Sequence, residues 1–215
     1  MEQIIKTAFQ TPISALEIGV WYGVGSTNIW LNNLKENSSI LLLDSWMPYS
    51  SESDLKDPGW NYKQMDDMST DAFLSAFLNV KKFQSEQAHK NIRINMVRGE
   101  STSLLPLLKD DSLDFIYIDG DHKYKNVKHD IQQAKRLINK KFGVICGDDL
   151  EKLPTPELVA LARQNTDTDF FRKEEFHPGV MLAISEELPM VHMVNGFWWI
   201  VCSEGQFNPN LLRPG

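Results

Sequence analysis

Two short segments of this chain combine an apolar run with closely spaced carboxylates. They are residues 114–122 (DFIYIDGDH) and residues 142–149 (FGVICGDD). Each pattern is typical of a buried parallel strand whose C-terminal tip carries polar side chains. Ligands of open α/β sheets bind outside the carboxyl ends of the strands, so side chains at two such tips can converge. We therefore expect one site that contains Asp119, His122, Asp148 and Asp149.

Three carboxylates and an imidazole suit a divalent cation and a proton acceptor. Carboxylate oxygens are ligands that Mg²⁺ prefers, with Mn²⁺ and Ca²⁺ as alternatives. A cation held there could bind an acceptor hydroxyl and lower its pKa, and His122 could accept the proton. The alternative is that Asp119 and Asp148 only cap the helices that follow, and that His122 only bonds its neighbours.

Five apolar runs predict the strands that must position these residues. They are residues 13–19, 40–44, 92–97, 114–118 and 142–146. Between the last two runs, apolar residues recur at spacings of four, three and four, which is one face of an α-helix. These residues are Val127, Ile131, Ala134 and Ile138. Strands that alternate with helices indicate βαβ units and a parallel sheet with right-handed crossovers.

The C-terminal part of the chain predicts an antiparallel pair of strands. Residues 191–194 and 197–201 flank Asn195-Gly196, a dipeptide that favours a two-residue type I′ turn. The whole pattern predicts a Rossmann-like α/β sandwich of three layers, with a seven-stranded, mostly parallel sheet that ends in this hairpin. The Trp198-Trp199 pair fits either the core or a subunit contact, so a homo-oligomer remains one alternative.

Two segments exceed the minimal alternation of strands and helices. The first insertion, residues 46–90, contains a helix near residues 70–83, and its expected apolar side consists of Phe73, Leu74, Phe77 and Leu78. The second insertion, residues 150–177, contains a helix start at Thr155-Pro156. Such insertions at the ligand end of a sheet tend to be lids or acceptor loops. The chain of 215 residues otherwise fits a single domain.

A glycine-rich turn follows the first predicted strand. It reads Glu17-Ile-Gly19-Val-Trp-Tyr-Gly23-Val-Gly25. Glycines let the backbone approach a ligand, and Ser26 can cap the helix that follows. The spacing differs from the Gly-x-Gly-x-x-Gly of dinucleotide enzymes. Glu17 would repel a pyrophosphate but attract a ligand with sulfonium and ammonium groups, and Asp44 can bind ribose hydroxyls at the tip of the second strand.

These motifs resemble those of the class I S-adenosylmethionine-dependent methyltransferases. Residues 118–130 (IDGDHKYKNVKHD) and 143–149 (GVICGDD) are similar, more narrowly, to macrocin O-methyltransferase and other bacterial sugar O-methyltransferases. The resemblance spans roughly residues 13–202. It implies the class I methyltransferase fold and S-adenosylmethionine as the cofactor. It also implies O-methylation of a hydroxyl on a small polar acceptor such as a sugar, assisted by a divalent metal, for which Mg²⁺ is the expected ion.

The resemblance further implies a role for individual residues. The expected cofactor-binding residues are Glu17, Gly19, Gly23, Gly25, Ser26, Asp44, Gly99, Glu100, Ser101 and Asp119. Within that set, Asp44 would bind the ribose, and residues 99–101 would hold the adenine. The expected metal ligands are Asp119, Asp148 and Asp149. His122 would be the general base and, with Asp119, one of the two catalytic residues.

Composition and charge exclude several other classes of protein. A net charge of −7 argues against nucleic acid as the partner, since phosphate binding requires a basic face. No apolar run approaches the roughly 20 residues that cross a bilayer. Cys146 and Cys202 lie in apolar runs and no signal peptide precedes them, which favours a cytoplasmic protein. Two functional alternatives remain, an NAD(P)-dependent oxidoreductase and a non-catalytic S-adenosylmethionine-binding subunit.

Overall fold

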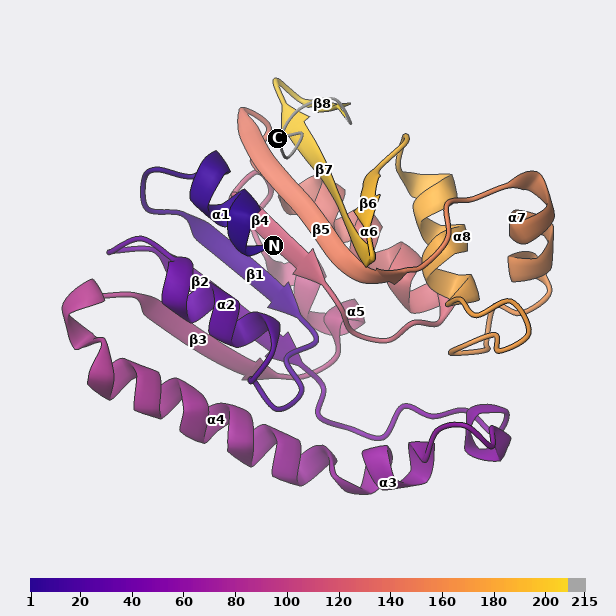
Figure 1. Ribbon diagram of the computed structural model, residues 1–215. Coiled ribbons are helices and arrows are strands. Elements are labelled where there is room, and N and C mark those ends of the chain that lie inside the picture. The colour runs from indigo at the N-terminus through magenta and orange to yellow at the C-terminus, as the bar shows by residue number, and fades with distance from the viewer. Residues whose placement is uncertain (209–215) are drawn as a thin grey trace.

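A mixed sheet of eight strands runs through the computed structural model, which describes residues 1–208 (Figure 1). Its strands are β1 (Ser14–Ile18), β2 (Ser39–Asp44), β3 (Arg93–Arg98), β4 (Phe115–Ile118), β5 (Phe142–Leu150), β6 (His192–Val194), β7 (Gly196–Ser203) and β8 (Gln206–Asn208). The spatial order is β3-β2-β1-β4-β5-β7-β6, and β8 pairs with β7. The strands β1 to β5 pair in parallel, and every pair that includes β7 is antiparallel. The predicted fold class is confirmed.

Helices cover both faces of the sheet. One face carries α1 (Glu2–Ala8), α2 (Ser26–Asn33) and α4 (Ser69–Glu86), and the other carries α5 (Ser101–Leu104), α6 (Tyr124–Leu137) and α8 (Pro178–Glu187). The helix α3 (Tyr62–Asp67) leads into α4, and α7 (Pro156–Arg163) packs on α8. Short 3₁₀ turns complete the elements at η1 (Asp54–Lys56), η2 (Ala88–Lys90) and η3 (Leu105–Leu107).

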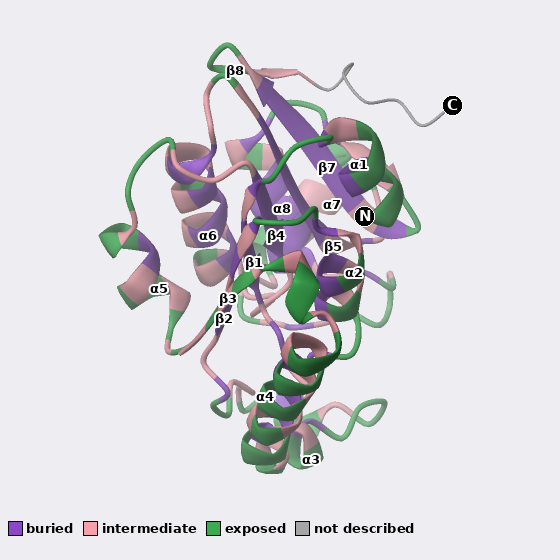
Figure 2. Ribbon diagram, turned by 90° about the vertical axis from the view of Figure 1, so that its left-hand side faces the viewer, coloured by how far each residue is buried: buried purple, intermediate pink, exposed green. Residues whose placement is uncertain are grey.

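Apolar side chains fill the space between the sheet and each layer of helices. In β1, Ala15 belongs to the cluster under α1 and α2, whereas Leu16 and Ile18 belong to the cluster under α6 and α8. This division follows from the two-residue alternation of side chains along a strand. Figure 2 shows the buried strands between partly exposed helices. The two clusters fix the sheet, and therefore the positions of its strand tips.

The register of the parallel strands brings their carboxyl ends to one edge. Ile18 lies opposite Leu43 in β2 and Ile118 in β4, and Ile118 lies opposite Gly147 in β5. The residues that follow these positions therefore meet at the same edge, as expected for an open parallel sheet. The sequence places a glycine or a carboxylate at each of these tips: Gly19, Asp44, Asp119 and Asp148.

The terminal hairpin has the predicted turn. Val194 pairs with Phe197, and the two residues between them have positive φ angles, +51° at Asn195 and +88° at Gly196. A type I′ turn requires this geometry at both central positions. Trp198 and Trp199 are 1% and 3% exposed, so this pair belongs to the core.

The buried face of α4 differs from the predicted apolar side. Small residues, Ala72 and Ala76, are fully buried, whereas Leu74, Phe77 and Leu78 are 51%, 41% and 64% exposed. The small residues let α4 approach the glycine turn closely, because a Cβ on Gly23 would lie 3.1 Å from the Ala76 Cα. The predicted apolar face was therefore wrong for these three residues, whereas the fourth, Phe73, is partly buried and packs against the cluster under α1 and α2. Within residues 1–208, no helix combines the length and apolar character that a membrane span needs.

Candidate functional site

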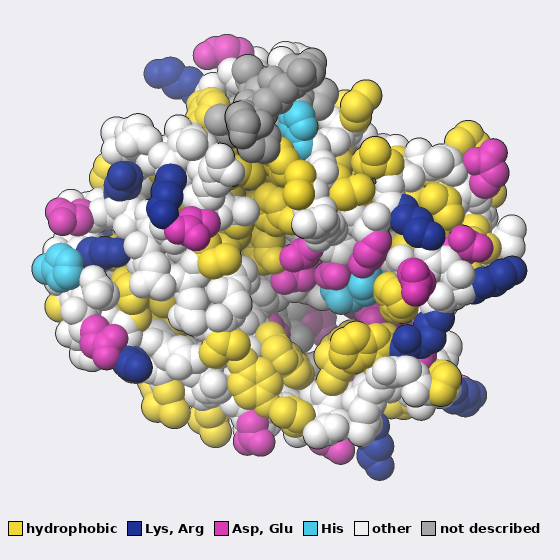
Figure 3. Space-filling model, in the orientation of Figure 1, with side chains coloured by type: hydrophobic (Ala, Val, Ile, Leu, Met, Phe, Trp, Pro, Cys, Tyr) yellow, Lys and Arg dark blue, Asp and Glu magenta, His cyan; other side chains and the backbone are white. Residues whose placement is uncertain are grey.

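A cavity of about 850 Å³ opens at the carboxyl edge of the parallel strands. Its wall includes the glycine turn after β1, the start of the first insertion after β2, the loops after β3 and β4, and Asp149 near the end of β5. Figure 3 shows acidic and histidine side chains gathered around a hollow in this face, with hydrophobic side chains along its opposite rim. The volume lies in the range of small-molecule sites.

Most of the predicted site residues line this cavity. They are Gly19, Asp44, Gly99, Glu100, Ser101, Asp119, His122 and Asp149. The other predicted residues are absent from its wall: Glu17, Gly23, Gly25, Ser26 and Asp148.

The glycine turn lies directly against the tip of β4. Gly19 has a φ of +88°, and a Cβ on this residue would lie 1.7 Å from the carbonyl oxygen of Asp119. Only glycine therefore permits the approach. Asp44 holds the rest of the turn, because its Oδ2 accepts hydrogen bonds from the amides of Val20 and Trp21, each at 2.8 Å.

Asp44 is consequently a structural support as well as a candidate ribose ligand. Its second oxygen, Oδ1, accepts a bond from the Trp46 amide at 2.7 Å. A carboxylate oxygen can accept more than one hydrogen bond, so capacity for a hydroxyl remains at the cavity wall. The indole of Trp46 also donates to the Trp21 carbonyl at 2.8 Å, which adds a second brace to the turn.

Glu17 lies behind the turn and is fully buried. The Ser26 hydroxyl donates to its Oε1, and the Thr27 hydroxyl donates to its Oε2 at 2.9 Å. Burial raises the pKa of Glu17 to about 8, and the charges of Asp119 and Asp44 act in the same direction, although the two hydroxyl bonds oppose the shift. The predicted capping role of Ser26 is wrong, because Gly25 is the N-cap of α2 and the Ser26 hydroxyl is directed to Glu17.

The loop after β3 meets a carboxylate that the sequence analysis missed. Ser101 begins α5 and hydrogen-bonds Asp130 of α6, which is 2% exposed and also lines the cavity. Burial raises the pKa of Asp130, and hydrogen bonds from His129 and Ser101 oppose that shift. The available signal was an acidic residue on the apolar face of the predicted helix, beside Val127 and Ile131.

The strand tips of β4 and β5 bring Asp119, His122 and Asp149 together. Donor atoms of these three side chains all lie within 4.8 Å of one another. Burial and the charge of Asp149 raise the pKa of Asp119 to about 7, with opposition from His122 and from the hydroxyl of Tyr117. Burial would also raise the pKa of Asp149, but the hydrogen bond and charge of His122 outweigh it and lower that pKa to about 2.

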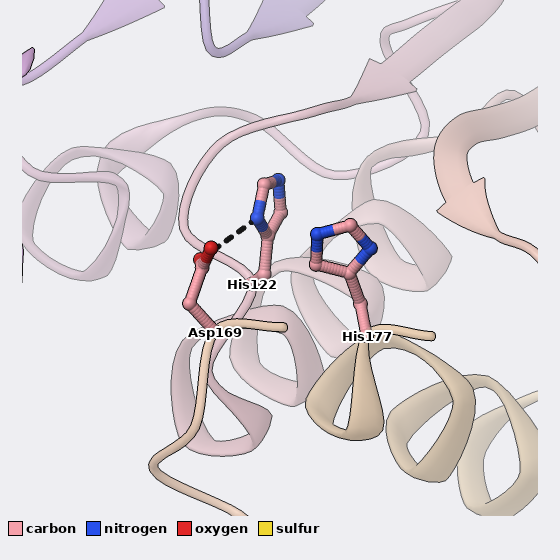
Figure 4. A group of neighbouring side chains, drawn as sticks. All are labelled: His122, Asp169 and His177. Atoms are coloured by element: carbon pink, nitrogen blue, oxygen red, sulfur yellow. Dashed lines mark hydrogen bonds and ion pairs between the residues drawn. The ribbon is translucent and has the colours of Figure 1, made fainter. Parts of the chain in front are cut away.

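His122 lies between two carboxylates. Its Nε2 is 3.0 Å from Asp149 Oδ2. On the other side of the ring, Nδ1 is 2.9 Å from Asp169 Oδ1 (Figure 4). Burial disfavours the charged ring, yet the hydrogen bonds to Asp149 and Asp169 outweigh burial and raise the pKa of His122 well above its ordinary value. In this arrangement each ring nitrogen faces a carboxylate, and the ring can act as a base only through Nε2 when that nitrogen carries no proton.

Asp148 does not join this cluster. The pairing of β5 with β7 shifts register between Gly147 and Leu150, and Asp149 has a φ of +66°. This irregularity leaves Asp148 directed to the β6–β7 turn, where a Cβ on Gly196 would lie 3.2 Å from its Oδ1. Among residues 1–208, the groupings of donor atoms that could hold a metal do not include Asp148.

The second insertion supplies three site residues that the sequence analysis did not assign. Asp169 bonds His122, while Glu151 Oε1 lies 2.7 Å from His177 Nδ1. His177 Nδ1 is also 3.7 Å from Asp149 Oδ1, and the rings of His177 and His122 meet edge to face with their centroids 4.4 Å apart. No spacing in the sequence marks these residues, because their positions depend on how the insertion folds back over the strand tips.

Comparisons with known proteins identify a family and related folds. Residues 16–150 match a family described as a methyltransferase domain, whereas no curated protein matches the chain. Among solved structures, cofactor-bound Rv0187 from MTB has a TM-score of 0.54 and 17% identity, with 89% of this chain and 72% of that chain covered.

Two further solved structures share the fold at low identity. The O-methyltransferase TomG from Streptomyces achromogenes, in complex with SAM, has a TM-score of 0.52 and 14% identity, covering 94% of this chain and 78% of that chain. A SAM-dependent methyltransferase from Aquifex aeolicus has a TM-score of 0.50 and 14% identity, covering 94% and 88%. Since the family match covers more than half of its residues, this chain belongs to the methyltransferase-domain family.

Proposed function

We propose that this chain is a single-domain, S-adenosylmethionine-dependent methyltransferase. Its acceptor is a hydroxyl on a small polar molecule such as a sugar. A divalent cation, for which Mg²⁺ is the expected ion, assists the transfer. One observation carries the proposal. A single cavity has the glycine turn and Asp44 on one part of its wall, and Asp119, His122 and Asp149 on another.

The cofactor half of the cavity supports a cationic nucleoside. The turn at Gly19 gives the backbone close access, and Asp44 keeps acceptor capacity for a ribose. Glu100 and Ser101, which the resemblance assigns to the adenine, line the same cavity. TomG, which shares the fold, is an O-methyltransferase whose structure contains SAM. Asp119 and Asp149 in the cavity wall would favour the positively charged S-adenosylmethionine over a pyrophosphate-containing dinucleotide.

The acidic half of the cavity fits a divalent cation. Ligand atoms of Asp119, His122 and Asp149 all lie within 4.8 Å of one another, close enough for these side chains to hold one ion. Asp119 and Asp149 also repel one another, and a bound cation would remove that repulsion. These three residues would hold the ion, which would supply Lewis acidity toward an acceptor hydroxyl.

His122 has two candidate roles that share one geometry. Its Nε2 faces the acidic cluster, where it can ligate the cation or accept the proton of the acceptor, and both roles require this nitrogen to be free of hydrogen. A His122→Gln variant separates them. Loss of Mn²⁺ binding would identify a ligand, whereas retained Mn²⁺ binding with loss of methyl transfer would identify a base.

Calorimetric titration with S-adenosylhomocysteine tests the cofactor assignment. We expect micromolar binding, with and without Mg²⁺, and no binding of NADH. Methyl transfer from labelled S-adenosylmethionine to a panel of hydroxylated sugars then tests catalysis. Binding of NADH instead would revive the oxidoreductase alternative, and binding without transfer to any acceptor would favour a non-catalytic subunit.

The Asp119→Asn variant tests the role of the cation. We expect Mn²⁺ affinity to fall by more than the roughly 10–100-fold that loss of an outer partner typically costs, because Asp119 would touch the ion itself. Methyl transfer should be abolished, while S-adenosylhomocysteine still binds. Asp114→Asn is the matched control, since Asp114 lies before β4 and bonds the Ser14 amide away from the cavity. Activity that persists in Asp119→Asn under strong chelation would contradict the metal role.

A further inference from the structure

The two insertions meet at a buried carboxylate, Asp169. This residue comes from the second insertion and is 4% exposed. One of its oxygens, Oδ1, lies 2.9 Å from His122 Nδ1, and the other, Oδ2, accepts a hydrogen bond of 2.6 Å from the hydroxyl of Tyr62. Tyr62 comes from the first insertion and is 3% exposed. Each insertion therefore contributes one residue to a chain of contacts that ends on His122.

The backbone of Asp169 is also held in place. Its amide donates to Asp54 Oδ1 at 3.2 Å, and Asp54 Oδ2 lies 3.1 Å from the ammonium of Lys123, the residue after His122. Asp169 is thus a carboxylate held in a fixed position through its backbone amide and both of its side-chain oxygens.

An ionised carboxylate offers only acceptors, so the ring nitrogen that faces it must carry a hydrogen. We propose that Asp169 is a positioning residue that keeps a proton on Nδ1 of His122, and that Tyr62 fixes the orientation of Asp169. The nitrogen left to exchange its proton is then Nε2, which faces Asp119 and Asp149. Partners of this kind commonly fix the tautomer of a functional histidine.

This inference rests on the proposed function, which gives His122 Nε2 its role in methyl transfer. The contacts among His122, Asp169 and Tyr62 do not depend on the cofactor. The inference deepens the proposal in one respect. The site is complete only when Tyr62 and Asp169 are in contact, so both insertions must be in place before His122 is oriented.

The structure suggests a test in which two substitutions have opposite effects. In an Asp169→Asn variant, we expect the Tyr62 hydroxyl to keep donating to the side chain at position 169. The amide oxygen then faces Tyr62, and the amide NH₂ faces His122 Nδ1. That arrangement drives the proton to Nε2. In the double variant with Tyr62→Phe, nothing restrains the amide, and it can turn its oxygen back to Nδ1. The second substitution should therefore restore the tautomer that the first one removes.

Nitrogen-15 spectra of histidine-labelled protein measure the tautomer directly. The His122 signals are assigned by their loss in His122→Gln. We expect a hydrogen-bonded Nδ1–H in the natural sequence, its loss in Asp169→Asn, and its return in the double variant. A purely structural role for these residues would instead make the double variant worse than either single variant.

Arg172→Gln provides the matched control. The Arg172 guanidinium pairs with Asp57 and joins the same two insertions, but it makes no contact with His122. The His122 Nδ1–H signal should be unchanged in this variant. The inference is overturned if Asp169→Asn keeps the Nδ1–H, if Tyr62→Phe fails to restore it, or if Arg172→Gln also removes it. Titration of the same samples with S-adenosylhomocysteine tests the proposed function separately, because absent binding would leave the spectra interpretable.

Discussion

Glu17 is a fully buried carboxyl group, and its burial links stability to pH. Its pKa rises from 4.5 to about 8 on folding, so the folded state favours the protonated form. Below pH 4.5 Glu17 is protonated in both the folded and the unfolded chain, and its full contribution to the free energy of unfolding is present. As pH rises through this window, the unfolded chain releases the proton first, and the free energy of unfolding falls by at most about 1.4 kcal/mol per pH unit.

A Glu17→Gln substitution should remove this pH dependence. Glutamine retains the size of the side chain and can bond the hydroxyls of Ser26 and Thr27, but it does not titrate. We expect the variant to gain stability relative to the natural sequence as pH rises from 4.5 to about 8. Urea unfolding at a series of pH values measures the difference, in which contributions from other groups cancel. A constant difference across the window would show that Glu17 is ionised in the folded chain.

At the scale of elements, the start of α8 sets the position of the loop that carries His122. A Cβ on Gly179 would lie 2.2 Å from the carbonyl oxygen of His122 and 2.3 Å from the amide of Tyr124. A glycine-to-alanine change within a helix usually stabilises a protein by roughly 0.5–1 kcal/mol. Here the added methyl group meets backbone atoms, which cannot rotate away.

The Gly179→Ala variant should therefore be destabilised, by about 1–3 kcal/mol, the usual cost of overpacking. Chemical unfolding measures the free energy, and the His122 resonances should shift in the same variant. Ser185→Ala in α8 is the control, because it changes the propensity of the same helix and loses only a hydroxyl bond to Leu182. An increase in stability at position 179 would mean that α8 does not press on this loop.

The elements also show which parts of the site the sequence could predict. Asp119 and His122 follow a strand, and the common edge of parallel strands dictates where they meet. Asp148 and Asp149 could not be separated, because a local shift of register and a positive φ decide which of them faces the cavity. Asp169 depends on the packing between two insertions, which no periodicity encodes.

The same limit explains the error on α4. A pattern of large apolar residues predicts a buried face when burial depends on hydrophobicity alone. In this helix the close approach to Gly23 requires a small side chain, and Ala76 meets that requirement. Close backbone approaches are properties of the folded arrangement, so composition of the helix by itself predicted the wrong side.

At the scale of the whole molecule, folding concentrates negative charge at one end of the sheet. Asp119, the pair Asp149 and Glu151, and Asp169 come from three parts of the chain, and the structure places them in overlapping groups around His122 and His177. In the unfolded chain these three parts are not held together and share no ligand. A divalent cation that binds among them should therefore bind the folded state selectively, and such selective binding stabilises a protein.

Mg²⁺ should accordingly raise the midpoint of thermal unfolding. At a concentration 100-fold above its dissociation constant, a ligand of the folded state alone adds about 2.7 kcal/mol. Potassium chloride at equal ionic strength should give a smaller shift. Both salts screen the charges of a chain with net charge −7, but only Mg²⁺ would also bind at the cluster. Asp119→Asn should lose the Mg²⁺-specific part and keep the salt effect. Equal shifts from both salts would mean that the histidines alone compensate the negative charge of the cluster and that the cluster has no selective site for a cation.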